Sequence, residues 1–372
     1  MLIAHLADTH LGHRHLHYVD SQGRNLREQD IFDAFRGAIR AIIDLRPAAV
    51  VHAGDFFDSY HPSTGALNVA LDGLTELREA GIPLVAIAGN HSTPRQRNTE
   101  HVFALLDRFG SHHFIWTEPR TVRIGELAVY GVPHCHDATT LAEQLRAAKP
   151  DADAVYNVLV LHGGFEALSQ VGTGEPGSVT LDPELLQEAS EFDYIALGHL
   201  HIAQPVRLNA FYSGSLERLT FADTAPSKGF AVIDLAKSPF ADDRLHLEQV
   251  PARGFFELPP IDCDGVDDPL PLIEKALNGQ ALDQAIVRCR LIGIDQGVWR
   301  ALDRRRVSEL TAACLHFELL PSFHSSGEIA VGAPADIGAF VQARTPKGLK
   351  ADELLARAND YLARAGSEVS AE

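Results

Sequence analysis

Six short runs of apolar and β-branched residues recur along the first 200 residues and end in polar or glycine-rich turns. They lie at 2–7, 48–53, 83–88, 127–132, 156–161 and 193–197. The runs are continuous rather than alternating, which is typical of strands buried on both faces. Helical patterns lie between several of them, at about 27–45, 64–80, 98–109, 138–148 and 182–190. This order predicts an α/β fold with largely parallel strand pairing.

The composition predicts a globular, cytoplasmic protein. A chain of 372 residues is too long to fold around a single small hydrophobic core, so we expect two or more domains. No run approaches the ~20 apolar residues of a membrane span. Asp8 and His10 interrupt the apolar N-terminus, which argues against a signal peptide. The four cysteines form no C-x-x-C pair, which argues against a disulfide framework and a thiolate zinc site.

A change of composition near residue 250 predicts a domain boundary. We expect a first domain at 1–250, a smaller α/β domain at 251–325 and a helical tail at 326–372. In the smaller domain helices and strands are predicted at 268–278, 284–292, 299–311 and 314–320. The tail contains two candidate helices, at about 334–343 and 349–364.

Asp, Asn and His residues follow five of the predicted strands. These residues are Asp8, His10, Asp55, Asn90, His91, His162, His199 and His201. Ligands of α/β sheets bind beyond the carboxyl ends of the strands, so these side chains are expected to converge on one crevice. Glycines beside them would let the backbone turn sharply and a phosphate approach; they are Gly12, Gly54, Gly89, Gly163 and Gly198.

The donor set favours divalent metal ions. Carboxylate, amide and imidazole ligands without thiolate suit Mn²⁺, Fe²⁺ or Zn²⁺. Without His91 the set has seven members, too many for one such ion, so we predict two ions bridged by Asp55. Two ions about 3.5–4 Å apart clamp a phosphate and generate a hydroxide near neutral pH. His91 is then left to protonate the leaving oxygen or to stabilise the phosphorane.

The motifs "DTHLG", "GDFFD", "GNH", "HGG" and "GHLH" lie between residues 8 and 201. Together they resemble the motif series of the calcineurin-like metallophosphoesterases. The stretches "YSGSLERLTF" and "KGFAVIDL", at 212–235, are similar to one branch of that family, the SbcD nuclease subunits of a double-strand-break repair complex. The resemblance implies a two-sheet β-sandwich flanked by helices, with a smaller cap domain and a helical tail.

The resemblance also implies a role for each site residue. One ion would be held by Asp8, His10, Asp55 and His201. The other ion would be held by Asp55, Asn90, His162 and His199. His91 would be the catalytic imidazole.

The implied activity is that of a Mn²⁺-dependent nuclease. It would be a 3′-to-5′ exonuclease on double-stranded DNA and an endonuclease on single strands, acting on DNA ends and hairpins. The cap domain would select duplex ends. Helices near 64–80 and 98–109 would form a homodimer, and the tail at 334–364 would bind the coiled coil of the SMC-like ATPase SbcC in a heterotetramer.

Two other functions are compatible with this fold. A phosphatase or small-molecule phosphodiesterase commonly continues the second motif as "GDxxDRG", whereas this chain has "GDFFDSYHP". A catalytically inactive scaffold would have lost ligands, and all seven are present together with His91. Asp58 lies where some relatives carry histidine, and Ser92 where many carry an acidic residue.

Weaker signals remain open. The loop with His13, His15 and His17, and the basic run Arg304, Arg305 and Arg306, could contact DNA or be solvated surface. "PHCH" at 133–136 is interpreted as structural because no fourth ligand accompanies it. The net charge of −18 argues against broad attraction to nucleic acid, but not against a local basic groove or a site with metal ions.

Overall fold

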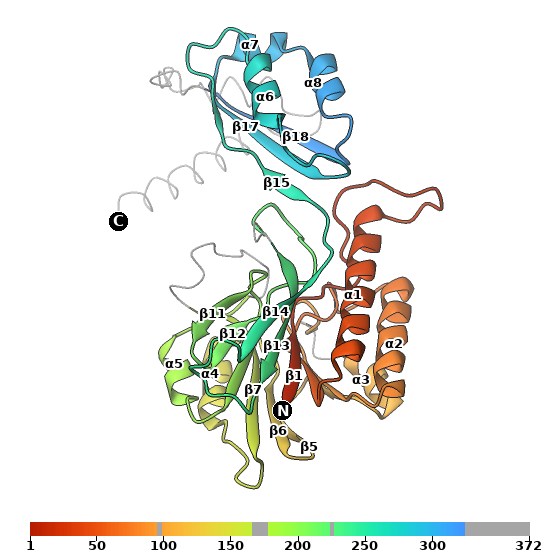
Figure 1. Cartoon of the computed structure of the whole chain (residues 1–372), viewed down its shortest axis with the longest axis vertical. Coiled ribbons are helices and arrows are strands. Elements are labelled where there is room, and N and C mark those ends of the chain that lie inside the picture. The colour runs from red at the N-terminus through yellow and green to blue at the C-terminus, as the bar shows by residue number, and fades with distance from the viewer. Residues whose placement is uncertain (95–98, 166–177, 224–226, 324–372) are drawn as a thin grey trace, which may run out of the picture. The chain divides into compact units, whose positions relative to one another are not determined.

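Two six-stranded sheets form the larger part of the chain in a computed structural model (Figure 1). The structure describes residues 1–94, 99–165, 178–223 and 227–323. The chain divides into two compact units: one contains Met1–Pro259, Ile273–Cys289 and Arg304–Leu319, and the other contains the rest. The domain boundaries at 250 and 325 stay predictions, and the predicted tail lies outside the described residues.

The first sheet has the strand order β14-β13-β1-β2-β3-β4. Its strands are β14 (Leu245–Val250), β13 (Lys228–Asp234), β1 (Leu2–Leu6), β2 (Ala49–His52), β3 (Leu84–Ile87) and β4 (His113–Ile115). Strands β1 to β4 are parallel, and β13 and β14 are antiparallel additions.

The second sheet has the strand order β11-β12-β10-β7-β6-β5. Its strands are β11 (Gln204–Arg207), β12 (Ala210–Tyr212), β10 (Tyr194–Gly198), β7 (Tyr156–His162), β6 (Leu127–Val132) and β5 (Arg120–Ile124). The four central strands are parallel and the two edge strands antiparallel. The predicted α/β fold with two sheets and largely parallel central strands is confirmed.

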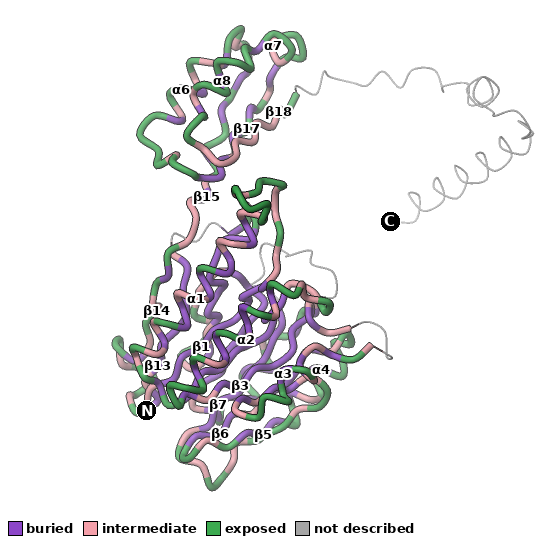
Figure 2. The backbone as a smooth tube through the Cα atoms, turned by 90° about the vertical axis from the view of Figure 1, so that its right-hand side faces the viewer, coloured by how far each residue is buried: buried purple, intermediate pink, exposed green. Residues whose placement is uncertain are grey.

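Both faces of the central strands are buried, which explains the continuous apolar runs (Figure 2). On β1, Ile3 belongs to the core between the sheets, whereas Ala4 faces the core under the helices. Helices α1 (Leu26–Leu45) and α2 (Thr64–Glu79) cover the first sheet. Helices α4 (Ala138–Ala147) and α5 (Glu184–Glu188) cover the second.

Two predicted helices differ clearly from the sequence pattern. The helix predicted at 98–109 is reduced to α3 (Phe103–Leu106) and a 3₁₀ turn (Asp107–Phe109) that Gly110 ends at φ 68°. The helix predicted at 299–311 is divided into α7 (Gln296–Ala301) and α8 (Arg304–Leu310). The division falls at Leu302, whose extended ψ of 128° stops α7.

A smaller sheet is formed by β15 (Phe255–Glu257), β16 (Ile261–Asp262), β17 (Ile286–Ile294) and β18 (His316–Phe323). The same stretch of sequence contains α6 (Leu270–Leu277) as well as α7 and α8. Strand β17 pairs in parallel with β15 and with β16, and β18 also pairs with β17. A separate two-stranded pair is formed by β8 (Gly164–Phe165) and β9 (Thr180–Leu181). None of the described helices is long and apolar enough to cross a membrane.

Acid should destabilise the protein through His5, a fully buried residue of β1. Its Nδ1 lies 2.9 Å from the Tyr194 hydroxyl on β10. Burial lowers the pKa of His5 from 6.5 to about 3, so only the unfolded chain protonates this ring between those values. His5 alone should therefore lower the free energy of unfolding by about 1.4 kcal/mol per pH unit as the pH decreases from 6.5 toward 3.

Urea unfolding at pH 7, 6 and 5 measures this slope. His5→Gln should remove the contribution of His5, whatever it does to stability at pH 7. The exposed His246→Gln on β14 is the matched control for loss of a histidine. A His5→Gln protein with the wild-type slope would contradict the prediction.

Candidate metal centre

All eight predicted site residues lie together beyond the carboxyl ends of β1, β2, β3, β7 and β10. His162 Nε2 lies 2.8 Å from Asn90 Oδ1 and 3.1 Å from Asp55 Oδ2. The ring of His10 lies 4.7 Å from that of His91 and 5.0 Å from that of His201. The second sheet joins the same cluster through the backbone N–H of His199, which is 3.0 Å from both Asp8 carboxylate oxygens.

Three groups within this cluster have ligand atoms within 4.8 Å of one another. They are Asp8 with His10 and His201, Asp8 with Asp55 and His162, and His10 with Asp55 and His91. Asp8 and Asp55 each occur in two groups, and both are buried. Buried His/Asp clusters of this kind fit a dimetal site.

The backbone is strained at the ligands. Asp8, His10, Asp55 and His199 have positive φ angles of 52°, 43°, 50° and 103°. Only three other non-glycine residues in the described part of the chain have a positive φ angle. Such conformations cost about 1–3 kcal/mol each and cluster at functional sites.

Two glycines make room for ligand side chains. A Cβ on Gly54 would lie 2.3 Å from His162 Nδ1, and one on Gly89 would lie 2.3 Å from Asp55 Oδ1. The sequence suggested that these glycines admit a phosphate. In the structure the absence of a Cβ at Gly54 and Gly89 leaves space for the side chains of His162 and Asp55.

Three imidazoles have Nδ1 fixed by a hydrogen bond. His162 donates to the Ala53 carbonyl (2.8 Å), His10 to Asp58 Oδ1 (3.1 Å) and His201 to Asp223 Oδ1 (3.2 Å). This bonding leaves Nε2 of each ring as the atom for a metal ion. Nε2 of His10 is buried and has no hydrogen-bond partner among the described residues, as a metal-binding atom requires.

The charges of the metal-free site also fit a cation. Burial raises the pKa of Asp8. Burial opposes ionisation of Asp55 as well, but the surrounding imidazoles of His162, His10 and His91 hold its pKa well below the usual range. Burial lowers the pKa of His162, yet Asp55 and Asp8 outweigh it and raise the value to about 9. The proton on His162 thus supplies positive charge that a metal ion would supply when bound.

Asp58 is a supporting residue to which the sequence assigned no role. Its Oδ1 accepts hydrogen bonds from Nδ1 of His10 at 3.1 Å and of His13 at 3.0 Å. Its backbone carbonyl accepts one from Nδ1 of His91 at 3.1 Å. A carboxylate only accepts, so it fixes the proton of each ring on Nδ1.

Asp58→Ala should weaken Mn²⁺ binding by about 10- to 100-fold, because His10 loses the partner that orients it. The backbone carbonyl that holds His91 remains in this variant. Isothermal titration with Mn²⁺ measures the effect, and Asp33→Ala, at an exposed acid on α1, is the control. Wild-type affinity in Asp58→Ala would contradict this role.

The stretches "YSGSLERLTF" and "KGFAVIDL" support His201. Besides its bond to His201, Asp223 accepts from the Leu219 backbone N–H at 2.7 Å. The Lys228 ammonium donates to the His201 carbonyl at 2.7 Å and to Ser215 Oγ at 2.9 Å. Sequence reasoning attributed these stretches to family resemblance alone; in the structure they fix the backbone and the ring of a predicted ligand.

The basic run at the start of α8 forms exposed ion pairs. Arg305 and Arg306 pair with Glu309, and Arg306 also pairs with Glu274. Exposed pairs of this kind are typical of solvated helix surface.

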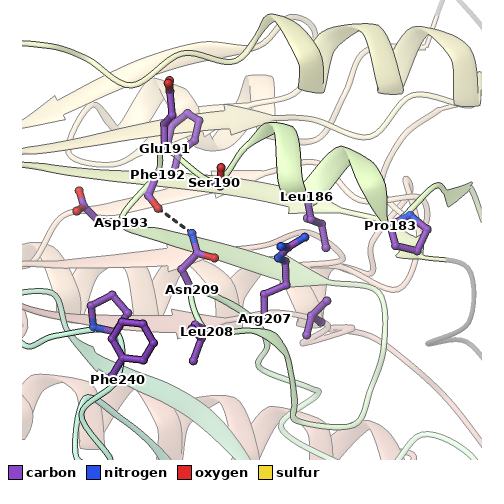
Figure 3. A pocket seen from close by; sticks show the side chains of 12 residues that line it. Pro183, Leu186, Ser190, Glu191, Phe192, Asp193, Arg207, Leu208, Asn209 and Phe240 are labelled. Carbon is purple, nitrogen blue, oxygen red and sulfur yellow. Dashed lines mark hydrogen bonds between the residues drawn. The ribbon is translucent and has the colours of Figure 1, made fainter.

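The groove in Figure 3 lies away from this cluster. Its mostly apolar wall includes Pro183, Leu186, Phe192, Leu208 and Phe240. The β11–β12 hairpin in that wall lies at the amino end of β10, because β12 runs parallel to β10. The predicted ligands follow the opposite end of β10, so this groove is not the metal centre.

Comparisons with a family model and with known proteins indicate the same family. The family model of the calcineurin-like phosphoesterases matches residues 1–203. The DNA double-strand break repair protein Mre11 of Sulfurisphaera tokodaii is 32% identical over 56% of this chain and 50% of its own length. Mre11 of Methanocaldococcus jannaschii is 28% identical over 75% of this chain and 74% of its own length.

Among solved structures, a dimetal phosphatase from Danio rerio aligns with a TM-score of 0.35 and 12% identity. The alignment covers 62% of this chain and 91% of the phosphatase. A likeness this low does not bear on function.

Proposed function

Since the chain belongs to the calcineurin-like phosphoesterase family, we propose that it is a two-metal DNA nuclease of double-strand-break repair. The metal-dependent phosphoesterase class follows from the family and from the His/Asp clusters. DNA as the substrate rests on the similarity to Mre11 proteins. The chain spans only half the length of the Sulfurisphaera tokodaii Mre11.

The observation that carries the proposal is the set of three His/Asp groups at the strand ends, in which Asp8 and Asp55 each occur twice. We assign one ion to Asp8, His10, Asp55 and His201, and the other to Asp55, Asn90, His162 and His199. Bound ions would neutralise phosphate charge and activate water. The hydrogen bonds at Nδ1 of His10, His162 and His201 present Nε2 of each ring as the ligand atom. The surrounding imidazoles keep the bridging Asp55 carboxylate ionised.

His91 is assigned the proton transfer to the leaving oxygen. Its backbone N–H donates to Asp55 Oδ1 at 2.9 Å, which fixes the residue beside the centre. Its Nδ1 donates to the Asp58 carbonyl, so Nε2 is the atom that can give a proton to the substrate. With 22% of its side chain exposed, a bound strand can reach it.

The remaining features are part of the same proposal. We propose Mn²⁺ as the metal, with 3′-to-5′ exonuclease activity on duplex ends and endonuclease activity on single strands and hairpins. Helices α2 and α3 are the candidates for a homodimer contact, and residues 334–364 for binding an SbcC- or Rad50-type ATPase. The net charge of −18 leads us to expect weak DNA affinity without that partner.

Cleavage of end-labelled duplex DNA with Mn²⁺, with and without EDTA, tests the function. The protein should cleave DNA and the diester bis-p-nitrophenyl phosphate, and should leave the monoester p-nitrophenyl phosphate intact. A preference for the monoester would instead indicate a phosphatase, and no turnover of any of the three would indicate an inactive scaffold.

A further inference from the structure

His134 of the "PHCH" stretch lies among the residues assigned to the second ion. It follows β6, in which Val132 pairs with Leu161 of β7, directly before His162. Its backbone N–H donates to the Ala88 carbonyl at 2.9 Å, two residues before Asn90. The loop after β6 is therefore fixed between the ends of β3 and β7.

The ring of His134 is 3% exposed and lies 6.2 Å from the ring of His162, at an interplanar angle of 87°. Neither of its nitrogens has a hydrogen-bond partner among the described residues. A protonated or neutral imidazole carries at least one N–H, and a buried N–H without a hydrogen-bond partner destabilises the folded protein.

Other buried histidines of this chain do not share this feature. His5 contacts the Tyr194 hydroxyl, and His52 Nε2 lies 3.1 Å from the Thr9 hydroxyl. A purely structural histidine would be expected to have a partner of this kind. The interpretation of "PHCH" as structural therefore does not explain His134. It also belongs to none of the groups with ligand atoms within 4.8 Å, so direct ligation together with those residues is not indicated.

We propose that His134 is a positioning residue of the second ion, whose ring hydrogen-bonds an oxygen at that ion, from water or from a phosphate group. The proposal rests on the two-metal function above. The oxygen at the ion would be the hydrogen-bond partner that the described residues do not supply to the buried ring. The end of β6 would then also contribute a residue to the metal centre.

Titration of the 372-residue chain with Mn²⁺, and then of the Mn²⁺-loaded protein with inorganic phosphate, tests this role by calorimetry. His134→Leu should weaken one of these two affinities by about 10- to 100-fold. His134→Gln keeps an N–H donor and should recover part of the loss. His246→Asn, at an exposed histidine of β14, should bind like the wild type.

The two titrations separate the source of the oxygen. A loss in Mn²⁺ affinity assigns it to water, and a loss confined to phosphate binding assigns it to the substrate. Two Mn²⁺ and phosphate bound with wild-type affinity in His134→Leu would overturn the inference alone. A wild-type protein that binds fewer than two Mn²⁺ would instead overturn the proposed function.

Thermal unfolding of the metal-free protein excludes a trivial cause. His134→Leu removes an unpaired polar group, so its melting temperature should equal or exceed that of the wild type. If both His134 variants failed to fold without metal, His134 would be a core residue and the inference would be wrong.

Discussion

Asp55→Asn should abolish Mn²⁺-dependent DNA cleavage, with a loss of at least about a thousandfold in rate. Asp55 lies in two of the three ligand groups, and its carboxylate is the only one assigned to both ions. Asn has nearly the same shape but no charge, so both ions lose a ligand charge worth several kcal/mol. Calorimetry should show that neither Mn²⁺ binds with wild-type affinity.

The same substitution has a second consequence in the metal-free protein. Asp55 is the main group that raises the pKa of buried His162 to about 9. Without it, burial should lower that pKa, so NMR titration of His162 should show a neutral ring at pH 7.5. Asp33→Asn on α1 is the matched control and should change neither result. Normal cleavage by Asp55→Asn would show that the site is assigned wrongly.

The position of the candidate site could be predicted from the local hydrophobic pattern and from the rule that ligands of α/β sheets bind beyond the carboxyl ends of the strands. Continuous apolar runs mark buried parallel strands, and polar residues directly after them must meet at one edge of the sheets. Asp8, Asp55 and His162 could be assigned to one cluster in this way. The pairing of β13 with β1 could not be predicted, because it joins residues 2–5 to 231–234 and no local signal sets that register.

The supporting residues could not be predicted for a different reason. Asp58 and Asp223 act through the far nitrogen of a histidine that is 48 or 22 residues away in the chain. Their contribution depends on side-chain distances that an aspartate in a turn does not reveal. His134 is a similar case, since its burial and its lack of a partner are properties of the folded loop.

His91→Asn should separate chemistry from metal binding. His91 is assigned to neither ion, so the variant should bind two Mn²⁺ with wild-type affinity and unfold at the wild-type temperature. Its kcat on DNA should fall by about 100- to 10,000-fold, the usual contribution of a general acid. The exposed His61→Asn is the control for loss of a histidine.

The leaving group identifies the role of His91. The 3′ oxygen of a nucleotide needs a proton to depart, whereas p-nitrophenolate departs without one. The loss caused by His91→Asn should therefore be much smaller for bis-p-nitrophenyl phosphate than for DNA. An equal loss on both substrates would assign His91 to stabilising the negative phosphorane, because that demand is the same for both leaving groups. A loss of Mn²⁺ binding would make it a ligand and contradict the assignment.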